Sequence, residues 1–284
     1  MKNLEHETKQ ILRENNLYAN KKLGQNFLIN QEIIENIVLG AEVCEKDLVI
    51  EIGPGLGSLT AELLKKAGRV TCIELDTNMI NVLEKRFKQN SKFKLIHGDV
   101  LKTDLQGLIK EEKQQHNLTN AKVVANLPYY ITTPIIMKLL EEKLNISSIT
   151  VMVQKEVAQR LAARPGDEFT GAITYAINYY SKPAIIIDVS RENFIPVPEV
   201  DSGVIKLEIL DEPSVKVKDE KILFEIIKQS FMQKRKTLVN SLSSSGQISK
   251  GQLQEILNKL GIDERIRAEK LTLEQFVGIA DMLL

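Results

Sequence analysis

The chain has 284 residues, 43% of them hydrophobic, and its 38 basic and 38 acidic side chains give a formal net charge of zero. This length is sufficient for a large core and a second, smaller unit. Because the charges balance, the overall charge excludes no partner, and any nucleic-acid site has to be a local basic patch. The two cysteines, Cys44 and Cys72, lack the spacing of metal ligands, so we predict reduced thiols and no metal site.

The N-terminal region lacks the apolar core of a signal peptide, and Glu5, Glu7 and Glu14 argue against a transit peptide. No apolar run approaches the ~18 residues that a membrane-spanning helix needs. We therefore expect a cytoplasmic protein without a membrane partner.

Strand-like and helix-like segments alternate from Asp47 onward. The expected strands are residues 47–53, 69–76, 93–100, 121–127, 147–156, 183–190 and 203–210, and the expected helices are residues 59–68, 77–89, 134–144 and 171–180. The second of these helices opens with Thr77, a residue type that commonly caps helices. Such alternation predicts parallel βαβ units and a doubly wound α/β sheet.

The pattern changes after residue 212. From Asp219 onward the expected segments are all helical, at residues 222–233, 251–261 and 273–283. We therefore predict two domains, an α/β domain over residues 1–210 and a small all-helical domain over residues 211–284. The second is small enough to need its neighbour to complete a core.

A glycine-rich loop, EIGPGLGSLT over residues 51–60, follows the first expected strand of this sheet. Gly53 and Gly55 allow a tight turn and a close approach of the backbone to a ligand. The loop departs from the dinucleotide-binding pattern at Ser58, where glycine or alanine is expected, and Pro54 removes a backbone donor.

Three acidic residues, Glu51, Glu74 and Asp99, fall at the carboxyl ends of the first three expected strands, where open α/β sheets bind ligands. Glu74 follows Gly53 by 21 residues, the position at which a carboxylate accepts hydrogen bonds from ribose hydroxyls. S-adenosylmethionine has an adenosine without a pyrophosphate, so it fits this loop, with Glu74 at the ribose and Asp99 at the adenine amino group. NAD remains the alternative cofactor, and a helix cap or a loop carboxylate is the alternative role of Asp99.

The motif NLPY, Asn126 to Tyr129, ends the fourth expected strand. Methylation of an adenine amine requires its nitrogen to become tetrahedral, and acceptors aimed at its two hydrogens favour that change. The Asn126 side-chain oxygen and the Leu127 carbonyl oxygen are suitable acceptors, and Pro128 fixes the turn. Tyr129 offers a flat face on which a base can stack. The simpler interpretation is a strand-end turn with buried tyrosines.

Together these motifs resemble the small-subunit (16S) ribosomal RNA adenine dimethyltransferases, a family of class I S-adenosylmethionine-dependent enzymes. The resemblance spans nearly the whole chain and includes KKLGQNFL over residues 21–28, FIPVPEVDSGV over residues 194–204 and KRKTLVNSL over residues 234–242. It implies a Rossmann-like methyltransferase sheet and S-adenosylmethionine as the cofactor. It also implies dimethylation of two adjacent adenosines near the 3′ end of 16S ribosomal RNA, within an immature small ribosomal subunit, by a monomer.

The resemblance further implies roles for individual residues. Cofactor contacts are expected from Asn26, Leu28, Gly53, Gly55, Glu74, Asp99 and Asn126, and catalytic roles from Asn126, Leu127, Pro128, Tyr129 and Phe194. Gln25 is expected to order the N-terminal loop around the target base. Phe194 resembles the aromatic residue that closes on the other face of that base, and an ordinary core aromatic is its alternative interpretation.

The basic residues Lys234, Arg235 and Lys236 lie in an acid-free stretch of the helical domain. We predict that they contact RNA phosphates, with a solvated helix face as the alternative. Arg160 and Arg164, on an expected loop near the substrate, are predicted to add RNA contacts. Double-stranded RNA is recognised through its shape and backbone, so we expect no base-reading code in these residues.

Three other functions remain open. The first is the related large-subunit (23S) ribosomal RNA adenine methyltransferase of the macrolide-resistance type, which shares the glycine loop and N-x-P-Y but is disfavoured by KKLGQNFL and KRKTLVNSL. The second is a non-catalytic RNA-binding assembly factor on the same fold, which need not retain the glycines and the NLPY motif. The third is a nicotinamide oxidoreductase.

Overall fold

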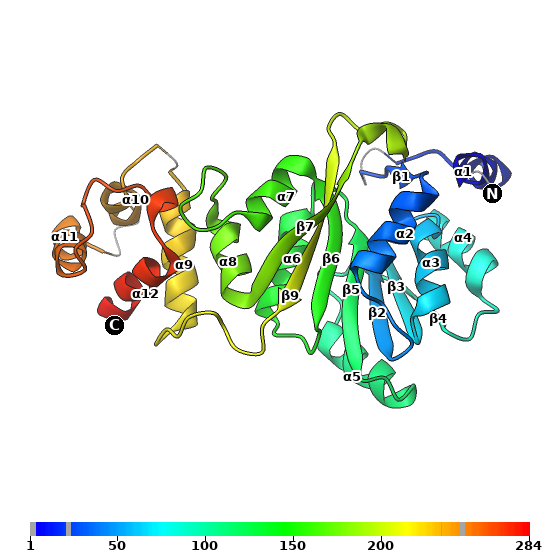
Figure 1. Ribbon diagram of the computed structural model, residues 1–284, viewed down its shortest axis with the longest axis horizontal. Coiled ribbons are helices and arrows are strands. Elements are labelled where there is room, and N and C mark those ends of the chain that lie inside the picture. Colours follow the sequence, from blue (N-terminus) through cyan, green and yellow to red (C-terminus); the bar gives the residue numbers. More distant parts are fainter. Residues whose placement is uncertain (1–3, 21–23, 234, 245–247) are drawn as a thin grey trace. The chain divides into compact units, whose positions relative to one another are not determined.

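The computed structural model describes residues 4–20, 24–233, 235–244 and 248–284. The contacts of the chain divide it into two units (Figure 1). The first contains the residues up to Ala158 together with Pro183–Ile209, and the second contains Gln159–Lys182 and Leu210–Leu284.

Within the described residues, seven strands form one sheet in the order β4-β3-β2-β5-β6-β9-β7. Their bounds are β2 Asp47–Ile52, β3 Arg69–Glu74, β4 Phe93–His97, β5 Asn120–Asn126, β6 Ser148–Gln154, β7 Ser181–Val189 and β9 Ser202–Ile209. Neighbours from β4 to β6 are parallel, and the register places Ile50 of β2 between Thr71 and Val123. Every residue of β2 is buried, as is typical of a central parallel strand. The predicted parallel βαβ units are thus confirmed for these five strands.

The strand β9, which is the last of the sheet in chain order, runs opposite to the parallel strands. β9 is antiparallel to β6, with Ile205 opposite Val151. Between β7 and β9 the described chain forms only the 3-10 helix η2 (Arg191–Asn193) and the strand β8 (Phe194–Ile195), and no α-helix that could carry a parallel crossover. β8 pairs antiparallel with β1 (Phe27–Leu28) in a separate two-stranded sheet.

Some helices of the first unit begin at a residue whose side chain caps them. The bounds are α1 Leu4–Glu14, α2 Gln31–Gly40, α3 Ser58–Lys66, α4 Thr77–Phe87, α5 Leu105–Gln115 and α6 Thr132–Glu141, followed by α7 Lys155–Ala162, within which the first unit ends. Asn30 caps α2 by accepting hydrogen bonds from two backbone N–H groups. At α4 the expected cap was Thr77, but the cap is Asp76, whose Oδ1 accepts a hydrogen bond from the Asn78 N–H at 2.9 Å.

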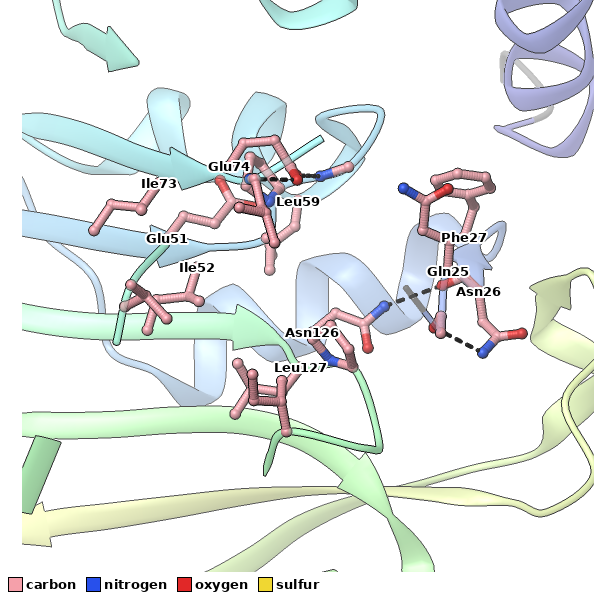
Figure 2. A pocket seen from close by; sticks show the side chains of 18 of the residues that line it. Gln25, Asn26, Phe27, Glu51, Ile52, Leu59, Ile73, Glu74, Asn126 and Leu127 are labelled. Atoms are coloured by element: carbon pink, nitrogen blue, oxygen red, sulfur yellow. Dashed lines mark hydrogen bonds between the residues drawn. The ribbon is translucent and has the colours of Figure 1, made fainter. Parts of the chain in front are cut away.

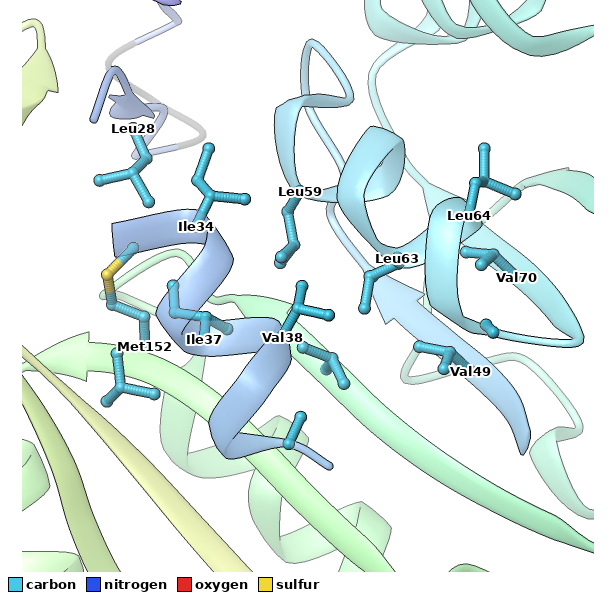
Figure 3. Packing of buried hydrophobic residues seen from close by; sticks show 14 of the residues in the cluster. Leu28, Ile34, Ile37, Val38, Val49, Leu59, Leu63, Leu64, Val70 and Met152 are labelled. Carbon is cyan, nitrogen blue, oxygen red and sulfur yellow. The ribbon is translucent and has the colours of Figure 1, made fainter. Parts of the chain in front are cut away.

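The main core of the first unit lies between the sheet and the helices α2 and α3. Ile34 and Ile37 of α2 pack with Leu63 of α3 and Val49 of β2, and none of these side chains is more than 2% exposed (Figure 3). Burying a side chain of this kind contributes ~1.5–3 kcal/mol. This packing fixes the end of β2, and therefore the position of the glycine loop that follows it.

The second unit consists mainly of the helices α8 Ala172–Tyr180, α9 Glu220–Phe231, α10 Leu238–Ser243, α11 Lys250–Lys259 and α12 Leu273–Met282. Its core contains the Tyr175 ring, edge-on to Phe276 with the centroids 4.8 Å apart. The Tyr175 hydroxyl lies 3.0 Å from the carbonyl oxygen of Ala268 and 2.7 Å from that of Leu271, so this buried group is not left unpaired. Across the described part of the chain, no helix is both long and apolar enough to cross a membrane.

The predicted boundary at residue 210 omits one segment of the second unit. Residues 159–182 were assigned to the α/β domain because of their place in the sequence, whereas by their contacts they belong with the C-terminal helices. Tyr179 and Tyr180 of α8 contact Phe224 of α9, with ring centroids 5.2 and 5.6 Å apart. Contacts between residues so distant in the sequence leave no local signal.

Candidate active site

A pocket opens at the carboxyl ends of the parallel strands of the first unit. It is lined by the glycine loop after β2, the ends of β3 and β4, the NLPY motif after β5, and the N-terminal segment from Gly24 to Leu28 (Figure 2). All the residues predicted to contact a cofactor line it, namely Asn26, Leu28, Gly53, Gly55, Glu74, Asp99 and Asn126. Leu127, Pro128, Tyr129 and Gln25 line it as well.

The glycine loop leaves open space beside its first glycine. Gly53 has a φ of 65°, and a Cβ added there would meet no atom within 4 Å. Gly55 has a φ of 56°, and a Cβ on it would come within 3.3 Å of the Phe27 ring. Both backbone conformations favour glycine, and the loop can therefore approach a ligand closely at Gly53.

The Glu74 carboxylate ties this loop to the end of β3. Its Oε2 accepts a hydrogen bond from the Gly55 N–H at 3.1 Å, and its Oε1 accepts from the N–H groups of Leu75 and Asp76 at 2.8 and 2.9 Å. Burial raises the pKa of Glu74, and the three backbone donors oppose that rise. Oε1 already accepts two hydrogen bonds, whereas Oε2 accepts one and has a lone pair left, so Glu74 can accept a further hydrogen bond from a ligand in the pocket.

Asp99 lies at the end of β4 and forms a local turn. Its Oδ1 accepts a hydrogen bond from the Leu101 N–H at 2.9 Å. The next helix, α5, is capped by Asp104, so Asp99 is not a helix cap, but its bond to Leu101 agrees with the other alternative role, that of a loop carboxylate. Asp99 therefore combines a turn with an acidic group at the pocket wall.

Glu51 also lines the pocket. From the sequence we expected it at the end of a strand, but we predicted no contact between it and a ligand. It is 1% exposed, and it accepts a hydrogen bond from the Thr60 hydroxyl at 2.6 Å. Burial raises the pKa of Glu51 to about 7, with Thr60 and Cys72 lowering it and the charge of Glu74 raising it. No cationic side chain contacts it among the described residues. The signal in the sequence is an acid that follows three apolar residues of the strand, two residues before the first glycine of the loop.

The NLPY motif turns sharply away from β5. The Leu127 N–H donates to the carbonyl oxygen of Met152 on β6 at 3.1 Å, and the Pro128 carbonyl oxygen accepts from the Thr132 hydroxyl at 3.1 Å. The Asn126 Nδ2 donates to the Asn26 carbonyl oxygen at 3.3 Å (Figure 2). With its nitrogen engaged, the Asn126 amide keeps its Oδ1 as a hydrogen-bond acceptor.

Tyr129 is half-buried beside this turn. Its hydroxyl lies 2.8 Å from the Ser202 hydroxyl, and burial raises its pKa. The neighbouring Tyr130 is 57% exposed, and Gly24 packs close to its ring. Aromatic surface is therefore available at the pocket, as the motif predicts.

Phe194 does not take the position expected from the sequence. Its side chain is 1% exposed, belongs to the core cluster that contains Leu28 and Ile34, and is not among the residues that line the pocket. The backbone pairing of Phe194 with Leu28 holds it in that core. The structure favours the alternative interpretation, in which Phe194 is a core aromatic without a free face for a base.

The predicted RNA contacts lie in two places. Gln25 lines the pocket, whereas Arg160, Arg164, Arg235 and Lys236 belong to the second unit. Arg160 is in the last turn of α7 and not on the expected loop, while Arg164 follows the helix. Arg235 and Lys236 are exposed between α9 and α10, so these two residues lie on a connector and not on a helix face. Lys234 lies outside the described residues, as do Lys21, Lys22 and Leu23 of the KKLGQNFL segment.

Comparison with known sequences adds to this geometry. A sequence profile described as "Ribosomal RNA adenine dimethylase" matches residues 16–284. A protein of Clostridium botulinum (strain Loch Maree / Type A3), named Ribosomal RNA small subunit methyltransferase A, is 46% identical over 276 residues, which cover 97% of this chain and 98% of the relative. A protein of the same name from Alkaliphilus oremlandii (strain OhILAs) is 46% identical over 277 residues, which cover 97% of this chain and 96% of the relative.

Comparison with solved structures extends the likeness to the fold. A dimethyladenosine transferase from Plasmodium falciparum is similar over 89% of this chain and 95% of its own, with a TM-score of 0.72 and 26% identity. A 23S rRNA methyltransferase is similar over 91% of this chain and 99% of its own, with a TM-score of 0.66 and 23% identity. The predicted Rossmann-like methyltransferase fold is thus confirmed.

Proposed function

Because the chain belongs to the ribosomal RNA adenine dimethylase family, we propose that it dimethylates the exocyclic amines of two adjacent adenosines near the 3′ end of 16S ribosomal RNA, using S-adenosylmethionine. The observation that carries this proposal is the pocket itself. It brings an acid suited to a ribose, Glu74, a second acid, Asp99, and the amide of Asn126 to one edge of the sheet.

The pocket residues fit this cofactor. The open space at Gly53 admits a ligand close to the backbone, and Glu74 Oε2 has a lone pair left for a ribose hydroxyl. Asp99 accepts from the adenine amino group. The buried Glu51 has no cationic partner among the described residues, and S-adenosylmethionine carries cationic groups that such a carboxylate attracts. NAD would bring a pyrophosphate, which this cluster of acids repels.

Catalysis in this proposal depends on alignment. S-adenosylmethionine supplies a methyl group on a positively charged sulfur and is already activated. Asn126 Oδ1 and the Leu127 carbonyl oxygen accept hydrogen bonds from the target amine and favour its tetrahedral form. No hydrogen bond to the Leu127 carbonyl oxygen is found among the described residues, so this acceptor is available. Because an amide does not titrate near neutral pH, these groups position the nitrogen and do not act as a general base.

Recognition of the RNA divides between the two units. Tyr129 provides a stacking face for the flipped adenine, and stacking of this kind is worth ~1–3 kcal/mol per base. Arg160, Arg164, Lys234, Arg235 and Lys236 contact phosphates and set the position of the substrate without reading its bases. Arg235 and Lys236 are exposed, and neither has an ion-pair partner among the described residues. The enzyme acts as a monomer in the cytoplasm, on an immature small subunit. The names of its relatives support the choice of the small subunit.

Deletion of the gene tests the proposal. Dimethyladenine is mapped by mass spectrometry in both ribosomal RNAs of the deletion strain, with and without a plasmid carrying the wild-type chain or Asn126→Ala. We expect the modification to disappear from 16S ribosomal RNA, and to return with the wild-type chain only. Loss from 23S ribosomal RNA would identify the large-subunit enzyme instead. Unchanged modification of both RNAs would favour the non-catalytic assembly factor.

A further inference from the structure

A series of hydrogen bonds joins the two ends of the pocket. It starts at Glu74, whose Oε1 accepts from the Asp76 N–H at 2.9 Å. The Asp76 Oδ2 accepts from the Gln25 Nε2 at 2.8 Å. Gln25 is followed directly by Asn26, whose carbonyl oxygen accepts from the Asn126 Nδ2 at 3.3 Å. The acid assigned to the ribose is therefore connected to the amide assigned to the target base.

Asp76 uses its two carboxylate oxygens for separate purposes. Oδ1 caps α4 through the Asn78 N–H, an ordinary structural role. Oδ2 receives the Gln25 side chain, 51 positions earlier in the chain, and this bond contributes nothing to the cap. Gln25 is also held at its other end, where its Oε1 accepts from the Asn20 N–H at 2.9 Å. Both halves of the Gln25 amide are thus fixed.

The anchored Gln25 determines where the next carbonyl group lies. The side chain of Asn26 folds back onto the same loop, with its Nδ2 donating to the Gly24 carbonyl oxygen at 3.2 Å. The Asn26 carbonyl group is thereby left to face Asn126 (Figure 2). An amide whose Nδ2 is committed in this way cannot rotate to present nitrogen where an acceptor is required.

We propose that Asp76 is a positioning residue for methyl transfer, and that it acts through Gln25 and the Asn26 carbonyl group to keep the Asn126 oxygen aimed at the target amine. This inference rests on the proposed function. It assigns to Asp76 a role separate from its helix cap, and it makes the orientation of the reactive amide depend on the turn that follows Glu74.

Exchanging the carboxylate at position 76 with the amide at position 25 tests the hydrogen bond between Asp76 and Gln25 directly. In Asp76→Asn the side-chain oxygen keeps the α4 cap, but the new amide nitrogen then faces the Gln25 nitrogen, so the bond is lost. In Gln25→Glu two carboxylates face each other. When both substitutions are combined, the amide nitrogen at position 76 donates to one carboxylate oxygen at position 25, while the other oxygen still accepts from the Asn20 N–H. The double variant therefore restores the bond with the same net charge as wild type.

Asp104→Asn, at the cap of α5, is the matched control for this exchange. Asp104 caps its helix through a backbone N–H, as Asp76 does, and it does not line the pocket. Any effect of replacing a capping aspartate by asparagine should therefore appear in this variant as well.

The first readout is single-turnover methyl transfer to small ribosomal subunits from the deletion strain, with S-adenosylmethionine saturating. Each single variant should be slower than wild type by about tenfold. The double variant should return to within about threefold of wild type, and Asp104→Asn should match wild type. All variants should melt within a few degrees of wild type. Single variants with the wild-type rate, or a double variant as slow as the product of the two single losses, would overturn the proposal.

The second readout does not depend on activity. Nuclear magnetic resonance follows hydrogen exchange of the Asn126 side-chain amide, whose signals are identified by their loss in Asn126→Ala. Exchange should be faster in both single variants and slow again in the double variant. If this pattern is found but the wild-type protein methylates no RNA, the proposed function is wrong and the positioning stands. Equal exchange in all four proteins would disprove the positioning, whatever the activity.

Discussion

The pocket of the first unit and the core of the second are stabilised in different ways. Around the pocket, acids and amides are held by specific hydrogen bonds, as at the buried Glu51 and the half-buried Asn126. In the second unit, aromatic rings pack around Tyr175, and the exposed cations Arg235 and Lys236 lie on the connector between α9 and α10. Under the proposed function, we expect changes at the pocket to alter the chemistry and changes at the connector to alter only how firmly RNA is held.

The largest effect should follow from removing the amide of the NLPY motif. Asn126→Ala removes a preorganised acceptor, so methyl transfer should fall by roughly 100- to 1,000-fold while RNA affinity and melting temperature stay close to wild type. Single-turnover kinetics and filter binding measure the two quantities. Asn145→Ala, an exposed amide outside the pocket, is the control. If Asn126→Ala lost RNA affinity as well as rate, the pocket would serve RNA binding too, and the proposed division of roles between the pocket and the connector would be wrong.

The buried acid of the pocket should give the protein an unusual pH dependence. The pKa of Glu51 is raised from its ordinary value of 4.5 to about 7, so the folded protein retains a proton that the unfolded chain has lost. The free energy of unfolding should therefore decrease as pH rises from about 4.5 to about 7, by on the order of 3 kcal/mol, and then level off. Denaturant titrations of wild type and Glu51→Gln measure this, and the variant should lose that decrease.

Glu112 provides the opposite case among the buried acids. Burial disfavours its charge, but hydrogen bonds from Lys94 and Arg69 outweigh burial and lower its pKa. Its contribution to stability is present above the unfolded pKa and is lost as pH falls through the lower folded value. Glu112→Gln should therefore destabilise the protein at neutral pH, unlike Glu51→Gln. Equal effects of the two variants would mean that Glu51 does have a cationic partner in the protein.

Two aromatic residues should respond differently to the same substitution. Tyr129→Leu removes the stacking face at the pocket and should lower transition-state stabilisation by about 1–3 kcal/mol. Phe194→Leu alters a packed core side chain, so it should lower the melting temperature and leave the single-turnover rate unchanged. Rates at saturating RNA, together with thermal melts, distinguish the two. A slow, normally stable Phe194→Leu variant would restore the role that the sequence predicted for this ring.

The smallest effect should come from the connector of the second unit. Replacing Lys234, Arg235 and Lys236 by alanine should weaken RNA binding and reduce the salt dependence of the affinity by about one unit of log–log slope for each lost phosphate contact. Calorimetry should find the same affinity for S-adenosylmethionine, because the cofactor pocket is in the first unit. Lys259→Ala, which removes a cation that is paired with Glu255, is the control. If the folded variant kept the wild-type salt dependence, these residues would not contact RNA phosphates and would form only a solvated surface.

The sequence predicted those parts of the molecule that depend on local patterns. Alternating strands and helices indicated the parallel β2–β6 core, and residue types at the strand ends indicated Glu74, Asp99 and Asn126. It did not predict the pairing of β1 with β8, because two short segments more than 160 positions apart carry no shared periodicity. The burial of Phe194 follows from that pairing, and the place of residues 159–182 follows from contacts of Tyr175 with Ala268 and Leu271. The Asp76–Gln25 bond is equally invisible, since each residue has an ordinary local role.

The pairing of β1 with β8 has a consequence for how ligands enter and leave. The floor of the pocket belongs to a sheet of long, paired strands. Its N-terminal wall, Gly24 to Leu28, pairs with the rest of the unit through strands of only two residues each, with a few side-chain hydrogen bonds beside them. Local unfolding costs least where few backbone hydrogen bonds must break. Local unfolding should therefore separate the N-terminal segment from the pocket more often than it opens the parallel sheet. The cofactor and its product can then exchange with solvent while the parallel strands, and the acids at their ends, remain in place.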